Sequence, residues 1–457
     1  MPSYCLLFKT ARDLLINRPI NNQFYKKRRK ATISDLPTEC MQQIFYYIQT
    51  QEEGIYPALL VSRYWCRNIV PLLWEHPFRR FSKEYHSQPN KNSKNRILRV
   101  YQRSNNKLLS TLFSCLSEQD NLLLASQLSR LQHRIKVPQS QQTLFNYPCY
   151  LQEFSYSDLE LIILSYLQRW YTNDSHEFFY PQIRLISTFL CKLFFQKSNL
   201  NSLYFEKIFP ELDIPNFIEI DNKHFVFSSI TRFTFTYSDP ITQNILNFLK
   251  IVSNFCTHID FLEFKLKSSD YNIDVKEAIV KIIGSQNCLK HFSIEHITKD
   301  GVEPIIFSLK NHTRSLVSLR LSHVQFTESC ISLISQFNNL NSLILDNCEG
   351  LSNEILYSHF LLSKLIINSQ QQDITLPLLK KFGKNLKSLG LSIYDLEIAD
   401  KLLSFCPQVN KIYLNIYVET TEKCCDYEEL KKMEESWKNV IKSAYPHRSI
   451  SLPISFF

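Results

Sequence analysis

Glycine is unusually scarce in this sequence. Only six glycines occur among 457 residues, and the two closest, Gly383 and Gly390, are seven positions apart. A loop that cradles phosphate needs two or three glycines within a few positions, because the backbone must approach the phosphate closely. The sequence therefore excludes P-loop nucleotide triphosphatases, protein kinases and the usual dinucleotide-binding folds.

Closely spaced metal ligands are also missing. The thirteen cysteines form no CxxC pair, and only Cys424 and Cys425 are neighbours. The nearest histidines, His291 and His296, are five positions apart and would lie on opposite faces of a helix or a strand. We expect no metal and no other cofactor. The odd cysteine count and the lack of a signal-peptide pattern favour free thiols in a reducing compartment, the cytoplasm or the nucleus.

Long apolar runs and acidic excess are absent as well. No apolar run approaches the about 18 residues of a membrane span, so we expect no membrane insertion.

The net charge of +9 is uneven: residues 1–30 carry +7, residues 31–80 carry −1, residues 81–200 carry +6 and residues 201–457 carry −3. A negative C-terminal half argues against nucleic-acid binding there. The run KKRRK, Lys26 to Lys30, is either a nuclear-import signal or a solvated basic linker.

A short amphipathic helix is expected directly after this basic segment. In LPTECMQQIFYYI, residues 36–48, Met41, Ile44, Phe45 and Ile48 form one apolar stripe. The following IYPALLVSRYWCRNIVPLLWEHPF, residues 55–78, is rich in large apolar side chains. Two or three short helices cannot bury that much apolar surface among themselves. The surplus predicts packing against the rest of the chain or against a partner.

Residues 33–78 resemble an F-box, the motif that binds the Skp adaptor of SCF ubiquitin ligases. The resemblance is carried by Leu36-Pro37, by VSRYW ending at Trp65, and by the later Leu73-Trp74, and it is close to F-box proteins of the large fungal families. One departure is EEGIYP, residues 52–57, where many members have an Asp-Leu pair. The resemblance implies the Skp adaptor, and through it a cullin, as partners. The residues predicted to build the adaptor-binding module are Leu36, Pro37, Ile44, Ile48, Val61, Trp65 and Trp74.

Nine short segments repeat along the C-terminal half. LVSLRL at Leu316 and LNSLIL at Leu340 are typical, with apolar residues at positions 1, 4 and 6. Successive segments start 22 to 30 residues apart, from Leu200 to Val409, which is close to the leucine-rich-repeat period. Cys348 occupies the Asn/Cys position of that repeat. One repeat cannot bury its own apolar face, so we expect a stacked solenoid with a parallel sheet on its concave side.

The strand period of two separates a buried and an exposed set of residues. We predict nearly complete burial of positions 4 and 6: Leu319, Leu321, Leu343, Leu345, Leu365, Ile367, Leu389 and Leu391. Positions 3, 5 and 7 should face outward and bind the target: Arg232, Glu263, Lys265, His291, Glu295, Ser318, Arg320, Ile344, Asp346, Lys364, Ile366, Asn368, Lys411 and Tyr413. Their mix of both charges and a few apolar side chains suits a protein or peptide. The alternative is a merely solvated sheet face, with the target bound elsewhere.

The predicted fold class is α/β, with four segments. Residues 1–32 form a basic N-terminal segment, 33–78 a small helical F-box, 79–199 a helical bridge, and 200–457 a leucine-rich-repeat horseshoe. The function that this organisation favours is that of a substrate-recognition subunit of an SCF-type ubiquitin ligase, which is not itself an enzyme. Two alternatives stay open: a non-ligase repeat scaffold or nuclear interaction protein, and an enzyme that uses the Cys424–Cys425 pair.

Overall fold

The computed structural model describes the chain in two compact units, which divide between Val70 and Pro71. The described residues are 36–49, 55–78, 87, 91–131, 135, 137–138, 143–169, 176–221, 223–237, 240–266, 273–297, 299–368, 372–393, 404–418, 435, 439, 449–451 and 454–456. The basic segment 1–32 with its KKRRK run, and the Cys424–Cys425 pair, lie outside these residues. None of the described helices is long and apolar enough to cross a membrane.

The first unit contains α2 (Thr38–Gln49), the 3-10 helix η2 (Tyr56–Leu60) and the start of α3 (Arg63–Glu75). Met41 and Phe45, one turn apart on α2, are fully buried. The Phe45 ring meets the Trp65 ring edge-on, with centroids 5.1 Å apart. Ser62 caps the N-terminus of α3, because its side chain accepts a hydrogen bond from the backbone N–H of Trp65 at 3.1 Å. Two residues of the predicted apolar stripe, Met41 and Phe45, thus contribute to the small core of this unit.

The second unit begins with helices. They are α5 (Lys91–Ser114), α6 (Glu118–Leu131), η3 (Tyr147–Tyr150), α7 (Tyr156–Leu167), η4 (His176–Phe179) and α8 (Tyr180–Lys197). All twelve residues of α7 are buried, as an apolar helix in the middle of a core requires. Between η3 and α7 lies a short strand, β1 (Glu153–Ser155), which pairs with β2 in parallel. The sheet therefore starts inside the segment 79–199.

Within the described part of the chain, twelve strands form one parallel sheet, and β1 to β11 follow one another in chain order. The remaining strands are β2 (Ser202–Phe205), β3 (Arg232–Tyr237), β4 (Phe261–Leu266), β5 (His291–Ile297), β6 (Ser318–Val324), β7 (Ser342–Asp346), β8 (Lys364–Asn368), β9 (Ser388–Ile393), β10 (Lys411–Val418), β11 (Ser449–Ser451) and β12 (Ile454–Phe456). Both β11 and β12 pair with β10.

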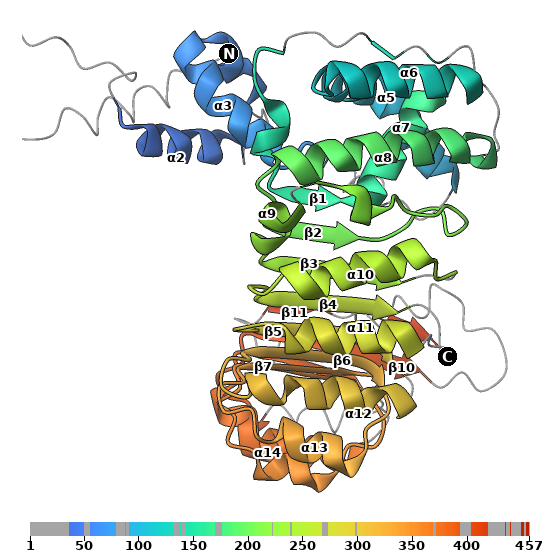
Figure 1. Cartoon of the computed structure of the whole chain (residues 1–457). Coiled ribbons are helices and arrows are strands. Elements are labelled where there is room, and N and C mark those ends of the chain that lie inside the picture. Colours follow the sequence, from blue (N-terminus) through green and yellow to red (C-terminus); the bar gives the residue numbers. More distant parts are fainter. Residues whose placement is uncertain are drawn as a thin grey trace, which may run out of the picture. The chain divides into compact units, whose positions relative to one another are not determined.

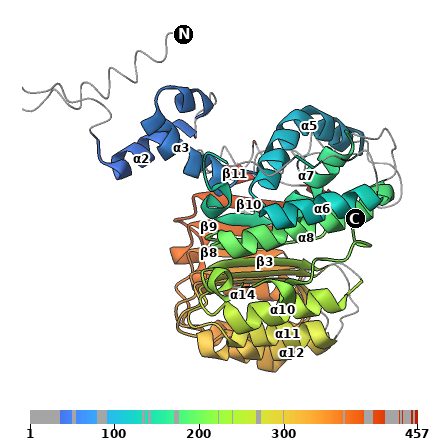
Figure 2. The ribbon, with the colours of Figure 1, turned by 45° about the horizontal axis from the view of Figure 1, so that its top comes forward.

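Helices connect most of these strands. They are η5 (Phe217–Glu219), α9 (Lys223–Ser228), α10 (Gln243–Phe255), α11 (Ile273–Gly284), α12 (Lys299–Ser308), η6 (Leu309–His312), α13 (Glu328–Ile334), η7 (Asn353–Tyr357), α14 (Gln372–Phe382) and η8 (Gly383–Asn385). Figures 1 and 2 show α10 to α12 stacked in a layer along one side of the sheet. The predicted α/β fold class is confirmed, and the arrangement is consistent with a solenoid of repeats.

The predicted repeat register is also confirmed. All eight predicted core positions, from Leu319 to Leu391, are at most 2% exposed. The strand pairing aligns them in two buried rows, since Leu321 pairs with Leu345 and Leu345 with Ile367. In the earlier repeats phenylalanine takes the same place, and the rings of Phe205 and Phe235 stack 5.9 Å apart. Cys348 is buried, and its thiol donates a hydrogen bond to the carbonyl of Leu321 at 3.3 Å.

Glu160 on α7 is a charged residue type in the middle of this core. Its side chain is fully buried, and its Oε2 accepts a hydrogen bond from the backbone N–H of Ile208 at 2.7 Å. Burial raises the pKa of Glu160 to about 8, although that N–H and the charge of Lys207 oppose the rise. At neutral pH the folded chain therefore holds this carboxyl group largely protonated.

The first prediction concerns two adjacent residues of β7. Leu343 is fully buried and Ile344 is half-buried on the other face of the sheet. Leu343→Ala leaves a cavity and should lower the free energy of unfolding by about 2 to 5 kcal/mol. Ile344→Ala is the matched control and should cost less than about 1 kcal/mol. Chemical denaturation of the two variants measures the difference, and an equal or larger loss for Ile344→Ala would contradict the register.

The second prediction concerns Glu160 and pH. The folded pKa of Glu160 is raised from 4.5 to about 8, so the unfolded chain loses this proton first as the pH rises. Stability from this group is complete below pH 4.5 and is lost toward pH 8, by up to about 1.4 kcal/mol per pH unit. Glu160→Gln should remove that loss. Between pH 5 and 8, the urea midpoint of unfolding should therefore fall for the wild type and fall less for the variant. The exposed Glu277→Gln is the control, and parallel pH profiles for all three proteins would refute the assignment.

Candidate binding surfaces

The first unit divides the predicted adaptor-binding residues into core and surface. Trp65 is only 7% exposed and packs on Phe45, so it supports the unit from inside. Leu36, Ile44 and Ile48 are half-buried, and Pro37 is exposed. The carbonyl of Leu36 accepts a hydrogen bond from the Tyr64 hydroxyl at 3.4 Å, which ties the start of α2 to α3.

Val61 and Trp74 lie in different surroundings. Val61 is 59% exposed at the end of η2. Trp74 belongs to the second unit and is half-buried, with its ring centroid 4.4 Å from that of Tyr147. The seven residues predicted to build the adaptor-binding module thus divide between core and surface positions. Trp74 packs within the second unit.

Four further exposed apolar residues of the first unit were not among the predicted adaptor-binding residues. Tyr46 and Tyr47 on α2 are at least 60% exposed, as is Tyr56 on η2, and Leu60 is 90% exposed. The two tyrosines follow directly on the buried Phe45, so helical geometry places them away from the buried stripe. That spacing is the signal that could have identified them. Together with Val61 they give this small unit a large amount of solvent-exposed apolar surface.

The F-box-like family model matches residues 33–80. An F-box-like domain therefore covers α2, η2 and α3, and the exposed apolar residues lie on α2, on η2 and at the end of η2. The match supports an SCF-type adaptor-binding role and implies a Skp adaptor as partner. A comparison with curated proteins found no match for the chain.

In the second unit, the strand residues on the side of the sheet opposite the buried apolar rows form what we call the open sheet face, and strand register arranges it in rows. Most of these residues are exposed or half-buried, whereas Thr234, Thr236, Ser322 and Gly390 are buried. The first row runs Arg232, Phe261, His291, Ser318, Ser342, Lys364, Ser388 and Lys411. The second row runs Thr234, Glu263, Ser293, Arg320, Ile344, Ile366, Gly390 and Tyr413. The third row runs Thr236, Lys265, Glu295, Ser322, Asp346 and Asn368. All fourteen predicted target-binding residues lie in these rows.

Phe261 connects two predicted residues of the first row and was missed. It occupies position 3 of the repeat segment IDFLEF, so the repeat rule does place it on this face. The Arg232 guanidinium lies 4.4 Å from the centre of the Phe261 ring, and the His291 ring lies 6.0 Å beyond. Burial lowers the pKa of His291. The charge of Asp260 opposes this change, while the charges of Arg232 and Lys290 add to it. A neutral imidazole, an aromatic ring and a cation therefore line β3 to β5.

The later repeats present a more apolar strip in the second row. Ile344 and Ile366 are half-buried neighbours, whereas Arg320 and Tyr413 are exposed. Gly390 lies between Ile366 and Tyr413, and a Cβ there would come within 2.8 Å of the Ile366 side chain. The missing side chain lets Ile366 extend along the row. In the third row, the Asn368 amide donates a hydrogen bond to the Asp346 carboxylate at 3.0 Å.

Proposed function

We propose that this chain is the substrate-recognition subunit of an SCF-type ubiquitin ligase, in which the F-box-like domain binds the Skp adaptor and the repeats bind a target protein. The observation that carries the proposal is that two candidate surfaces lie on two different compact units. The exposed apolar residues of the first unit lie within the F-box-like match, and the open sheet face belongs to a separate compact unit. One chain would thus carry an adaptor-binding surface on one unit and a target-binding surface on the other.

Catalysis by such a complex would need no covalent chemistry from this chain. A bound target would be held near a charged ubiquitin carrier, which raises the effective concentration of its lysines. We therefore propose a non-enzymatic role. We further propose that the chain acts in the cytoplasm, the nucleus or both. The resemblance to fungal F-box proteins supports the pairing of this domain with leucine-rich repeats.

The open sheet face suggests the kind of target. Arg320, Ile344, Ile366 and Tyr413 combine an exposed cation, two aliphatic side chains and a phenol in one row. Aromatic, arginine and aliphatic side chains are typical anchors of protein interfaces, with charges at the rim. A folded or extended protein segment fits this composition, with apolar side chains toward β7 and β8 and acidic groups toward Arg320.

Our third prediction tests the adaptor surface through Leu60 and Val61. The double variant Leu60→Ala with Val61→Ala removes two exposed side chains from η2 and its end, so the fold should be retained. We expect adaptor affinity to fall at least about tenfold, which corresponds to about 1.4 kcal/mol. Calorimetric titration with purified Skp adaptor measures it. Leu122→Ala with Leu123→Ala, exposed on α6, is the matched control.

Two results would count against this part of the proposal. If the wild-type chain co-purifies with neither the adaptor nor a cullin, the ligase role is wrong and a repeat scaffold is the better interpretation. If the wild type binds and the Leu60–Val61 variant binds equally well, the role stands but the surface is assigned wrongly.

The fourth prediction tests the open sheet face in cells that lack the chain. The triple variant Arg320→Ala, Ile344→Ala and Tyr413→Ala should fail to restore turnover of the proteins that accumulate without the chain. Adaptor binding should be unchanged, because these residues lie outside the F-box-like match at residues 33–80. The control is Phe307→Ala, Lys310→Ala and Tyr357→Ala, a similar set of exposed residues on helices. Normal turnover with the first triple variant would show that the target binds elsewhere.

A further inference from the structure

Three successive strands end with polar residues in the same unusual backbone conformation. His296, His323 and Asn347 have φ angles of 59°, 53° and 48° and are the non-glycine residues with positive φ in the described part of the chain. Strand register places them side by side, since Glu295 pairs with Ser322 and Ser322 with Asp346. The left-handed region is sparsely populated by residues other than glycine, although asparagine and histidine tolerate it better than most.

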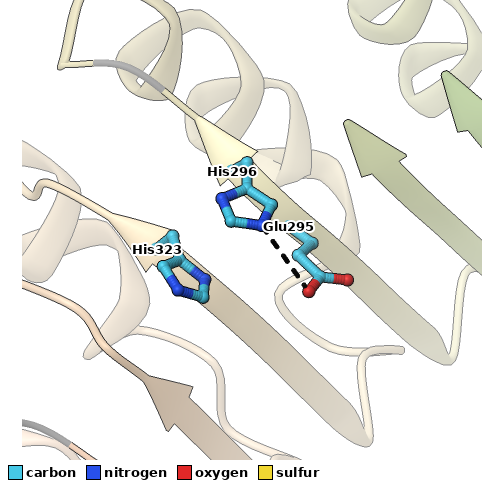
Figure 3. Close-up of side chains that lie close together, drawn as sticks. All are labelled: Glu295, His296 and His323. Carbon is cyan, nitrogen blue, oxygen red and sulfur yellow. Dashed lines mark ion pairs between the residues drawn. The ribbon is translucent and has the colours of Figure 1, made fainter. Parts of the chain in front are cut away.

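The left-handed turn changes where side chains point. In a regular strand, the consecutive residues Glu295 and His296 would face opposite sides of the sheet. Instead Glu295 Oε1 and His296 Nε2 lie 3.9 Å apart, on the same side. Figure 3 shows His296 and His323 next to each other at the ends of β5 and β6, with the Glu295 carboxylate directed toward His296. This is why the spacing of histidines in the sequence gave no sign of the cluster.

The two imidazole rings are stacked. Their centroids are 4.1 Å apart and their planes differ by 23°. Burial, and then the neighbouring His323, lower the pKa of His296, while Glu295 opposes the change. The neutral imidazole is the form that binds metals. Lys265, the neighbour of Glu295 in the third row, directs its ammonium to Glu263 at 3.7 Å.

We propose that Glu295, His296 and His323 bind a divalent transition metal of the zinc class at the end of β5 and β6. Each residue offers one ligand atom, and these atoms lie within 4.8 Å of one another. Two imidazoles and one carboxylate are a known three-ligand zinc set that leaves a fourth position open. Bound metal would tie two adjacent repeats together and present that open position beside the open sheet face.

Metal binding requires the two stacked imidazole rings to rotate apart, because their nitrogen lone pairs lie in the ring planes and must point at one ion. Ligands of a tetrahedral zinc ion at about 2.1 Å lie about 3.4 Å from one another, whereas these ligand atoms lie up to 4.8 Å apart, so they must approach one another by up to about 1.4 Å. His296 and His323 are exposed and Glu295 is half-buried, so rotation about their side-chain bonds is open to them. Ser322 Oγ lies 3.0 Å from His323 Nδ1, where it can accept that N–H and leave Nε2 for the metal. Asn347, now 3.3 Å from Nε2, would give way.

The fifth prediction is that the full chain, stripped of metal with a chelator, binds one zinc ion per molecule at this cluster. The double variant His296→Asn with His323→Asn should bind at least about tenfold more weakly, since each ligand lost removes a coordination bond. Asparagine tolerates the left-handed backbone, so the strand ends are kept. Competition with a chromophoric zinc chelator measures the affinity. Glu295→Gln is a second, milder variant that should also bind more weakly.

His291→Asn is the matched control, because His291 lies on β5 in the first row, away from the cluster. It should bind zinc like the wild type. Cobalt substituted into the wild type should show a tetrahedral spectrum without a thiolate band, which separates this site from the chain's cysteines. Zinc should also raise the melting temperature of the wild type but not of the double variant. Equal zinc affinity of wild type and double variant, or no stoichiometric binding by the wild type, would overturn the proposal.

Discussion

The burial of one apolar face per repeat, which no single repeat can achieve alone, is the constraint on which the second unit depends. Each strand places two apolar side chains, such as Leu343 and Leu345, against those of the strands on either side. The parallel pairing that covers these side chains also fixes the register of the whole sheet. The outward-facing residues are therefore aligned in rows as a consequence of core packing, with no separate interaction needed to align them.

The same register explains how binding surfaces arise from residues far apart in the chain. Arg232 and His291 are brought to the two sides of Phe261 by two strand pairings. His296 and His323 meet because they hold equivalent positions in adjacent repeats. A repeat architecture converts a spacing of one period in sequence into direct contact in space. Such contacts are invisible to a search for ligands that are close in sequence.

The first unit follows a different logic. Its core consists of a few large side chains, chiefly Met41, Phe45, Trp65 and Ile69, and it leaves Leu60 and Val61 largely exposed. A unit this small cannot bury all its apolar side chains. Large apolar residues therefore serve both its stability, in the core, and its proposed binding, on the surface. Trp65 shows the consequence, because this large apolar side chain of the predicted adaptor-binding module is buried in the core of the unit. Tyr46 and Tyr47 on α2 instead contribute exposed aromatic surface.

Sequence alone determined the fold class, the repeat register and the F-box-like segment, because each depends on periodic apolar residues that one strand or helix imposes locally. The eight core positions and the fourteen outward positions followed from a period of two. Tertiary structure decided the rest. Trp74 belongs to the second unit, and the sheet includes a strand at residues 153–155. Tertiary structure also brought Glu295 and His296 to one side, because a left-handed turn reverses the alternation that a sequence pattern assumes.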